Sequence, residues 1–233
     1  MALDYPDPDR TSVQPAASHG YYGLSRPEMV ELVPSGLESL LDVGCGEGAF
    51  LDAVRARDPN LRLCGIEQEE APARRARDRG LDVITGAFPD GIDASERFDC
   101  IVFNDVLEHL VDPWGALRAA RDLLGDSGCV VASIPNIRNL ETLFTLVRHG
   151  GWDYSDAGVL DRTHLRFFTR STIVELFDEA GYEIVSIKGG WPLSDRRSRA
   201  LRVLSLAAGR SMYRESCFRQ FHIVARPVAA PRP

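Results

Sequence analysis

Lysine is almost absent from this 233-residue chain, in which Lys188 is the only one among 27 basic residues. The basic residues are outnumbered by 34 acidic ones, which leaves a formal net charge of −7. A surface that binds nucleic acid needs surplus positive charge to neutralise phosphates, so the balance argues against a nucleic-acid partner. No apolar run approaches the roughly 18 residues of a membrane-spanning helix, which argues against a membrane partner.

The five cysteines contain no Cys-x-x-Cys pair, and most lie in or beside apolar runs. Scattered cysteines of this kind predict buried, reduced thiols in a cytoplasmic protein. The first residues lack the apolar stretch typical of a secretory signal. We expect a mobile N-terminal tail at 1–19 and a single domain at 20–233, and a homodimer stays open.

Short apolar runs alternate with stretches of helical periodicity along most of the chain. Strands are expected at 40–43, 61–66, 81–85, 98–103, 129–134, 182–187 and 218–225, and helices at 27–33, 49–57, 69–79, 113–124 and 169–180. Runs that are apolar throughout, separated by helices, predict a doubly wound α/β fold with a mostly parallel sheet. Residues 136–168 fit no strand–helix unit and predict a lid insertion.

The most informative segment is Leu-Asp-Val-Gly-Cys-Gly-Glu-Gly at residues 41–48, where a strand ends in three glycines and a helix follows. Glycine lets the backbone approach a ligand closely, and the start of the helix offers unpaired N–H groups. Glu67 ends the next strand, 19 residues after Gly48. A carboxylate at that place can accept hydrogen bonds from both hydroxyls of a ribose.

Two ligand classes compete for this loop. Its spacing fits a loose G-x-G-x-x-A dinucleotide fingerprint, so a nicotinamide-dependent oxidoreductase is one alternative. Asp42 and Glu47 favour the other class, because carboxylates repel a pyrophosphate and attract an ammonium or sulfonium group. The loop therefore favours a cationic nucleoside.

Four motifs together resemble those of the class I S-adenosylmethionine-dependent methyltransferases. The similarity is closest to the branch that includes ubiquinone-biosynthesis O-methyltransferases and other small-molecule methyltransferases. The motifs are the segment at 41–48, Gly-Ile-Glu at 65–67, Phe-Asp-Cys-Ile-Val-Phe-Asn-Asp-Val-Leu-Glu-His-Leu at 98–110 and Ser-Ile-Pro-Asn at 133–136. The resemblance spans residues 20–190. It implies a seven-stranded sheet with an antiparallel last strand, S-adenosyl-L-methionine as cofactor and a small-molecule acceptor.

The resemblance also implies which residues hold the cofactor. Glu67 would hold the ribose with Gln68 beside the adenine, while Tyr22 and Arg26 would lie near the methionine carboxylate. The family often has Gly-Asp after the third strand, whereas this chain has Gly-Ala-Phe, so the adenine contact is expected from the backbone at Ala87, from Phe88 or from Asp90. The rest of the methionine part is assigned to Asp42, Gly44, Cys45, Gly46, Gly48, Asn104, Asp105 and Val106.

The acceptor chemistry depends on a base. A hydroxyl acceptor needs one because alkoxide is scarce near neutral pH, whereas an amine only has to be unprotonated. His164 and His109 are the candidate catalytic bases, and Asp161 lies close enough in sequence to fix the tautomer of His164. Asp105, Glu108 and His109 also have the composition of a divalent-ion site, but we expect no metal requirement.

Aromatic residues gather in and after the insertion, at Trp152, Tyr154, Phe167 and Trp191. Aromatic side chains supply large apolar contact areas with polar handles, so we expect them to bind the acceptor together with Arg166. A small satellite core is the alternative. The sequence thus predicts methyl transfer to a hydroxyl group of a small molecule, such as a natural product, a sugar or a quinone-like compound. Transfer to an amine or a non-catalytic cofactor-binding role are the alternatives.

Overall fold

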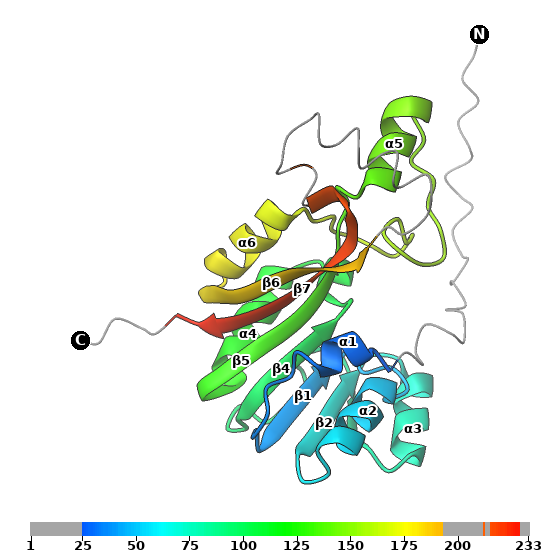
Figure 1. Ribbon diagram of the computed structural model, residues 1–233. Helices are drawn as coiled ribbons and strands as arrows, with labels where there is room; N and C mark the ends of the chain where they lie inside the picture. Colours follow the sequence, from blue (N-terminus) through cyan, green and yellow to red (C-terminus); the bar gives the residue numbers. More distant parts are fainter. Residues whose placement is uncertain (1–24, 193–211, 213–214, 229–233) are drawn as a thin grey trace.

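The computed structural model describes residues 25–192, 212 and 215–228, which build a fold around a seven-stranded sheet (Figure 1). The strands are β1 (Ser39–Val43), β2 (Arg62–Glu67), β3 (Asp82–Thr85), β4 (Phe98–Asn104), β5 (Leu124–Pro135), β6 (Tyr182–Pro192) and β7 (Phe218–Pro227). Their order across the sheet is β3-β2-β1-β4-β5-β7-β6, and β7 runs antiparallel to both of its neighbours. The predicted α/β fold with an antiparallel last strand is confirmed.

Helices cover both faces of the sheet. They are α1 (Pro27–Val30), α2 (Ala49–Arg57), α3 (Glu70–Asp78), the 3-10 helix η1 (Leu107–His109), α4 (Pro113–Leu123), α5 (Leu140–His149) and α6 (Arg170–Glu179). Helices α1, α2 and α3 pack on one face, and α4 and α6 pack on the other (Figure 1). Leu40 and Leu41 are both fully buried, but Leu40 packs in the core layer on one face of the sheet and Leu41 in the layer on the other face. Central strands that are buried on both faces therefore read as continuous apolar runs in the sequence.

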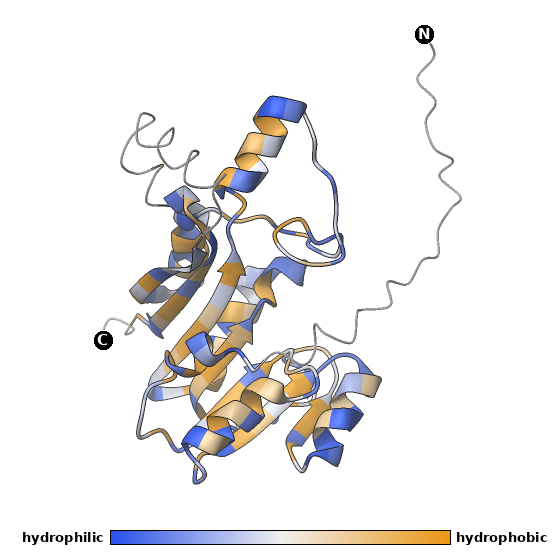
Figure 2. Cartoon of the chain, turned by 45° about the vertical axis from the view of Figure 1, so that its right-hand side comes forward, coloured by the Kyte–Doolittle hydropathy of each residue, from blue (hydrophilic) through white to orange (hydrophobic). Residues whose placement is uncertain are grey.

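Helix α5 is the main element that the sequence analysis did not predict. It begins at an N-cap, Asn139, whose side chain accepts a hydrogen bond from the Thr142 N–H at 3.1 Å, and Gly150 ends it. Leu140 is its one buried residue, while Phe144 and Val147 are exposed. Figure 2 shows this helix standing away from the sheet. Most apolar residues of α5 therefore do not pack in the core. Because the helix does not pack on the sheet, its segment did not fit a strand–helix unit in the sequence.

The boundaries of other elements also differ from the prediction, and strand β6 runs on to Pro192 rather than ending at residue 187. Helix α1 ends at Val30 rather than at residue 33. Strand β5 begins at Leu124, five residues before the expected start, and this residue pairs in register with Phe98. The glycines at 125 and 128 hide that early start, because glycine is unfavourable in strand interiors.

The insertion at 136–168 is tied to the sheet at both of its ends. A β-bridge joins Asn136 to Phe168. The N–H groups of Leu165 and Arg166 donate to the Glu108 carbonyl on η1 at 2.9 and 3.0 Å. The second half of the insertion is thereby placed directly after the end of β4.

The predicted tail at 1–19 lies outside the described residues, so the domain boundary stays a prediction. Within the part of the chain that the structure describes, no helix combines the length and the apolar character needed to cross a membrane. Cys45, Cys64, Cys100 and Cys129 are buried, as the sequence predicted, and form no disulfide.

Candidate active site

The glycine loop connects β1 to α2 at the carboxyl edge of the sheet. Gly44 and Gly48 have φ angles of 69° and 80°, which side chains rarely tolerate. A Cβ atom on Gly44 would also lie 2.7 Å from Cγ2 of Val106. The Gly44 N–H donates to the Ile66 carbonyl at 2.8 Å and ties the loop to β2. The loop is therefore a bare, tightly held turn of backbone beside the ends of β1 and β4.

Glu67, at the end of β2, is buried and held by backbone donors. One carboxylate oxygen accepts from the Gly46 N–H at 2.8 Å, and the other accepts from the Glu69 N–H at 2.9 Å. Each oxygen has a second lone pair, so the carboxylate can still accept hydrogen bonds from a ligand. These two hydrogen bonds fix the orientation of the Glu67 carboxylate, which the sequence analysis assigned to the ribose.

The turn after β3 lies next to Glu67, because the Gly86 N–H donates to the Glu67 carbonyl at 2.9 Å. Ala87 in this turn is exposed, as is Gln68. Phe88 is half-buried and packs edge-on against Phe103, with ring centroids 5.7 Å apart. The predicted adenine contacts therefore gather in one place.

A polar row crosses the sheet at its carboxyl edge, on the face covered by α1, α2 and α3. The strand register pairs Asn104 with Ser133 and Ser133 with His222, and it places Asp42 on the same face two residues before the positions level with Glu67 and Asn104. The polar row consists of Glu67, Asp42, Asn104, Ser133, His222 and Gln220, from β2, β1, β4, β5 and β7. Six polar side chains on one face of a buried sheet mark this edge as a binding site, since structural strands rarely bury polar groups without need.

Two members of the polar row have no partner among the described residues. One carboxylate oxygen of Asp42 and both amide atoms of Asn104 are buried without a hydrogen bond. Burial, and then the neighbouring Glu67, raise the pKa of Asp42 well above its usual value. Each unpaired buried group costs about 1–3 kcal/mol. The unpaired oxygens of Asp42 and Asn104 fit the ammonium end of a cationic ligand, whereas the Asn104 amide nitrogen needs an acceptor such as a carboxylate.

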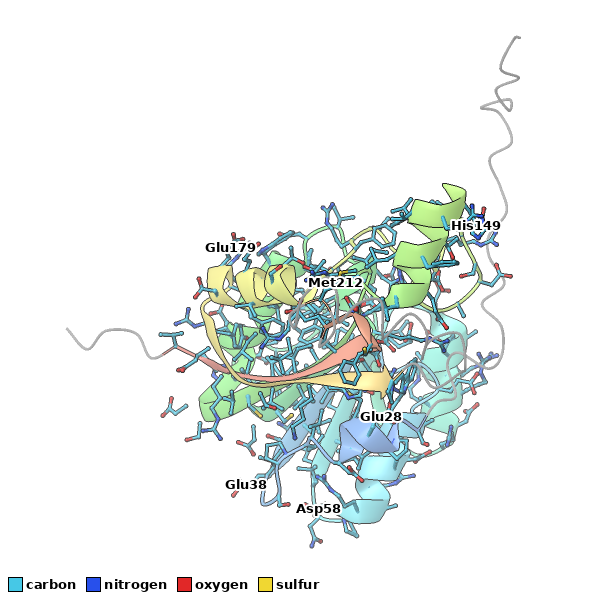
Figure 3. The ribbon with its side chains drawn as sticks, turned by 45° about the horizontal axis from the view of Figure 1, so that its top comes forward. Glu28, Glu38, Asp58, His149, Glu179 and Met212 are labelled. Atoms are coloured by element: carbon cyan, nitrogen blue, oxygen red, sulfur yellow. The ribbon has the colours of Figure 1, made fainter. Side chains whose placement is uncertain are left out.

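Arg26 reaches the same edge from the start of α1. Its guanidinium is buried, pairs with Asp105, and donates to Glu28 at 2.8 Å. Trp191 covers it, with the guanidinium carbon 5.2 Å from the ring centroid. Figure 3 labels Glu28 on α1, where the end of β6 approaches it. Trp191, expected at the acceptor, therefore lies beside the residue that was assigned to the cofactor.

Two residues of the loop differ in their surroundings from the sequence interpretation. The thiol of Cys45 is turned into the core, where a Cβ atom on Gly65 would meet it at 2.6 Å, and burial raises its pKa. Only the backbone of Cys45 is left to line a ligand. Glu47 forms an ion pair with Arg75 at 2.9 Å, so its charge is neutralised by a neighbouring helix instead of attracting the ligand.

The two candidate bases, His109 and His164, lie together, with ring centroids 4.7 Å apart. Nδ1 of His164 is 3.1 Å from the Val159 carbonyl, and Nδ1 of His109 is 3.3 Å from the Thr163 carbonyl. A carbonyl only accepts, so both Nδ1 atoms carry the proton and both Nε2 atoms are acceptors. Burial lowers the pKa of both imidazoles, with His109 lowering that of His164 further. Both rings are therefore neutral near pH 7.

Asp161 reaches the pair by a different route from the expected one. Its carboxylate accepts from the N–H and the hydroxyl of Thr163, at 2.8 and 2.6 Å. The Thr163 hydroxyl oxygen in turn lies 3.1 Å from Nδ1 of His109. Asp161 thus orients His109 through Thr163, while a backbone carbonyl fixes the tautomer of His164.

Glu108 completes this cluster. Its carboxylate is 1% exposed, and neither oxygen has a hydrogen-bond partner among the described residues, while Nε2 of His164 lies 3.9 Å away. Burial, followed by Asp105, raises the pKa of Glu108 well above its usual value. Ligand atoms of Glu108, His109 and His164 lie within 4.8 Å of one another. The sequence grouped Asp105 with Glu108 and His109, whereas the structure brings in His164.

Aromatic residues of the insertion pack on one side of the His109–His164 pair. Trp152 packs edge-on against Phe167 at 5.3 Å, and Phe167 lies 6.2 Å from the ring of His164. Tyr154 is 55% exposed. The Arg166 guanidinium donates to the Val111 carbonyl at 2.6 Å, which fastens the insertion to the loop after η1. Trp152 and Phe167 are thus placed for an acceptor, while Arg166 has a structural contact.

Sequence reasoning missed Ser133 and Gln220 in the polar row, and Thr163 beside the histidines; it considered Glu108 only as part of a metal site. One signal for Gln220 was available. Gln220 and His222 lie on either side of Phe221, so two polar residues recur on one face of the strand with the strand period of two. Tyr22 lies outside the described residues, and its assignment stays a prediction.

A family model described as a methyltransferase domain matches residues 21–187 of this chain. A ubiquinone biosynthesis O-methyltransferase of Cereibacter sphaeroides is 30% identical over 171 residues, which cover 67% of this chain and 68% of that protein. A protein of the same name from Pseudomonas aeruginosa is 29% identical over 161 residues, with 65% and 67% covered.

Solved methyltransferase structures share the fold at lower identity. The CcbJ methyltransferase from Streptomyces caelestis has a TM-score of 0.61 at 14% identity, covering 88% of this chain and 89% of that one. The plantazolicin methyltransferase BpumL, solved with a monoazolic desmethylPZN analog and SAH, has a TM-score of 0.58 at 16% identity, with 85% and 79% covered.

Proposed function

The chain belongs to the methyltransferase domain family and is a class I S-adenosylmethionine-dependent methyltransferase, and on this premise we propose that it methylates a hydroxyl group of a small molecule. Family membership removes the nicotinamide-dependent alternative. One observation carries the choice of oxygen: His109 and His164 lie together just past the end of β4, and each has its Nδ1 on a backbone carbonyl, which leaves Nε2 as an acceptor. Relatives that are named O-methyltransferases support the same choice.

The cofactor is proposed to lie along the polar row. Asp105 would receive the amino end of its methionine part together with Asn104 and Asp42, whose amide atoms and one carboxylate oxygen are buried without a partner among the described residues. Arg26 would hold the carboxylate, and Glu67 would bind the ribose. When bound, the cofactor supplies an electrophilic methyl group on a positively charged sulfur. The buried carboxylates of Asp42 and Glu67 match that positive charge.

We assign the base to His164, with His109 as its neighbour. Nε2 of His164 would accept the proton of the acceptor hydroxyl, while Nδ1 keeps its hydrogen bond to the Val159 carbonyl. Nε2 would then hold this proton 3.9 Å from the carboxyl group of Glu108. Trp152 and Phe167 would exclude water from this step and orient the acceptor. We further propose a cytoplasmic setting, because the buried cysteines are reduced.

The experiment that tests this function is a transfer assay with the full-length protein and methyl-labelled S-adenosylmethionine. The panel pairs phenols, catechols and sugar hydroxyls with amines of matched skeleton. We expect label on oxygen, and we expect loss of transfer in the double variant His109→Gln, His164→Gln. Label on nitrogen, undiminished in the double variant, would contradict the proposal and favour the amine alternative.

A further inference from the structure

Gln220 lies at the centre of a buried network that links the last strand to the cofactor edge. It pairs in register with Pro135, so the antiparallel direction of β7 brings it to the carboxyl end of β5. Its side chain is 2% exposed. A buried amide is tolerated when its donors and acceptor are satisfied, so the partners of Gln220 reveal what it does.

Those partners are the two members of an ion pair. The carbonyl oxygen of Gln220 accepts from Arg26 at 3.1 Å, and its amide nitrogen donates to the Asp105 carboxylate. Arginine has only donors and an ionised carboxylate has only acceptors, so the amide has one orientation in this network. His222 lies 3.1 Å from the same carbonyl oxygen. Gln220 therefore contacts both members of the ion pair and helps to fix Arg26 and Asp105 relative to each other.

Asp105 needs such support, because its backbone is strained. Its φ angle is 54°, in the left-handed region that favours glycine. The Ser133 hydroxyl accepts from the Asp105 N–H at 3.0 Å and donates to its carboxylate at 2.9 Å. The same hydroxyl accepts from Arg26 at 3.1 Å, so Ser133 and Gln220 both contact Asp105 and Arg26.

We propose that Gln220 is a positioning residue that orients the Arg26–Asp105 pair to receive the amino-acid end of the cofactor. That end carries an ammonium and a carboxylate on one carbon, so its two charges have a fixed separation. Asp105 attracts the ammonium, and Arg26 attracts the carboxylate with a planar pair of donors. Rotation of either partner removes the match. The inference rests on the proposed placement of the cofactor along the polar row.

The test compares two ligands in the full-length variant Gln220→Leu. S-adenosylhomocysteine carries the amino-acid end, and 5′-methylthioadenosine has the same nucleoside and sulfur without it. Calorimetry should show S-adenosylhomocysteine bound roughly tenfold more weakly, as expected for a change of about 1.4 kcal/mol. The affinity for 5′-methylthioadenosine should stay within about twofold of the wild type. Equal weakening of both ligands, or no weakening of either, overturns the inference.

Two further variants make the test robust. Arg226→Gln changes an exposed residue at the other end of β7 and should leave both affinities unchanged. If Gln220→Leu does not fold, Ser133→Ala removes the second donor to the Asp105 carboxylate and should show the same ligand preference. Weakening of both ligands alike by Ser133→Ala would count against the network as a device for the amino-acid end.

Asp105→Asn separates this inference from the proposed function. It should weaken S-adenosylhomocysteine selectively. If it does so while Gln220→Leu has no effect, the cofactor placement stands and the role of Gln220 is wrong. If Asp105→Asn weakens both ligands equally or neither, the placement of the amino-acid end is wrong as well.

Discussion

The two halves of the active site come from different kinds of structure. The cofactor half is the polar row and the glycine loop, which sit at the ends of buried strands and rarely expose a side chain. The acceptor half lies in the insertion, where Tyr154 and Leu165 are more than half exposed. Strand ends are rigid and hold a ligand in one geometry, whereas loops vary in sequence and often determine which partner binds. On the proposed placement, the strand ends would determine which cofactor binds and the insertion would determine which acceptor binds.

The largest effect should come from the acceptor half. His164→Gln removes the proposed base, and general-base catalysis contributes about 10²–10⁴-fold, so kcat should fall by at least about 10². The affinity for S-adenosylhomocysteine should stay unchanged, since His164 lies outside the polar row. His149→Gln is the matched control, because His149 is exposed at the end of α5 (Figure 3). A variant with near-native turnover would remove His164 from the mechanism.

The cofactor half should respond to Gly44→Ala. The new methyl group would lie 2.7 Å from Val106 and would narrow the loop. We expect affinity for S-adenosylhomocysteine to fall about 30-fold, or roughly 2 kcal/mol. Gly36→Ala carries a similar positive φ of 77° but meets no atom within 4 Å, so it controls for backbone strain. Equal affinities in the two variants would show that the loop does not approach the ligand.

The pH profile should separate the halves further. Glu108, His109, Asp161 and Asp105 all influence His164, but burial dominates and lowers its pKa below the usual 6.5. The base works when neutral, so kcat/KM should be flat near pH 7. At lower pH it should fall by about tenfold per pH unit once the pH passes below the shifted pKa. An amine acceptor, with a pKa near lysine's value of about 10, would instead show rates rising above pH 8. Rate measurements from pH 5 to 10 distinguish the two profiles.

The smallest expected effect is that of metal removal. Glu108, His109 and His164 are close enough to hold an ion, but the proposed base needs Nε2 of His164 free for a proton. Treatment with a chelator followed by gel filtration should leave kcat within about twofold, since no step is assigned to a Lewis acid. Loss of activity that returns on addition of Mg²⁺ or Zn²⁺ would replace the histidine base with a metal-assisted mechanism.

The sequence predicted the structure well where a residue type has few possible roles at its position. Gly44, Asp42 and Glu67 could be placed because strand ends, bare backbone and carboxylates at this spacing rarely serve any purpose except ligand binding. The doubly wound sheet followed from apolar runs such as Leu40–Leu41, whose side chains enter opposite core layers. Local spacing was enough for these features.

The rest depends on contacts between distant segments. Asp161 and His164 are three residues apart, yet Asp161 binds Thr163 and reaches His109, which is about 50 residues earlier in the chain. Gln220 meets Asp105 across 115 positions. Helix α5 was missed because its apolar residues are mostly exposed and do not follow the pattern of a helix that packs on the core. Spacing along the chain cannot predict such contacts, since they are set by strand order and by the path of the insertion.

Calorimetry and thermal unfolding of Asn104→Leu test the central claim, that unpaired polar atoms on the strand ends hold the cofactor. Leucine has the same branched arrangement of non-hydrogen side-chain atoms as asparagine and needs no hydrogen bond, so it relieves a cost of about 1–3 kcal/mol in the free protein. The account predicts a higher Tm without ligand, together with at least tenfold weaker binding of S-adenosylmethionine. A lower Tm with unchanged affinity would contradict it.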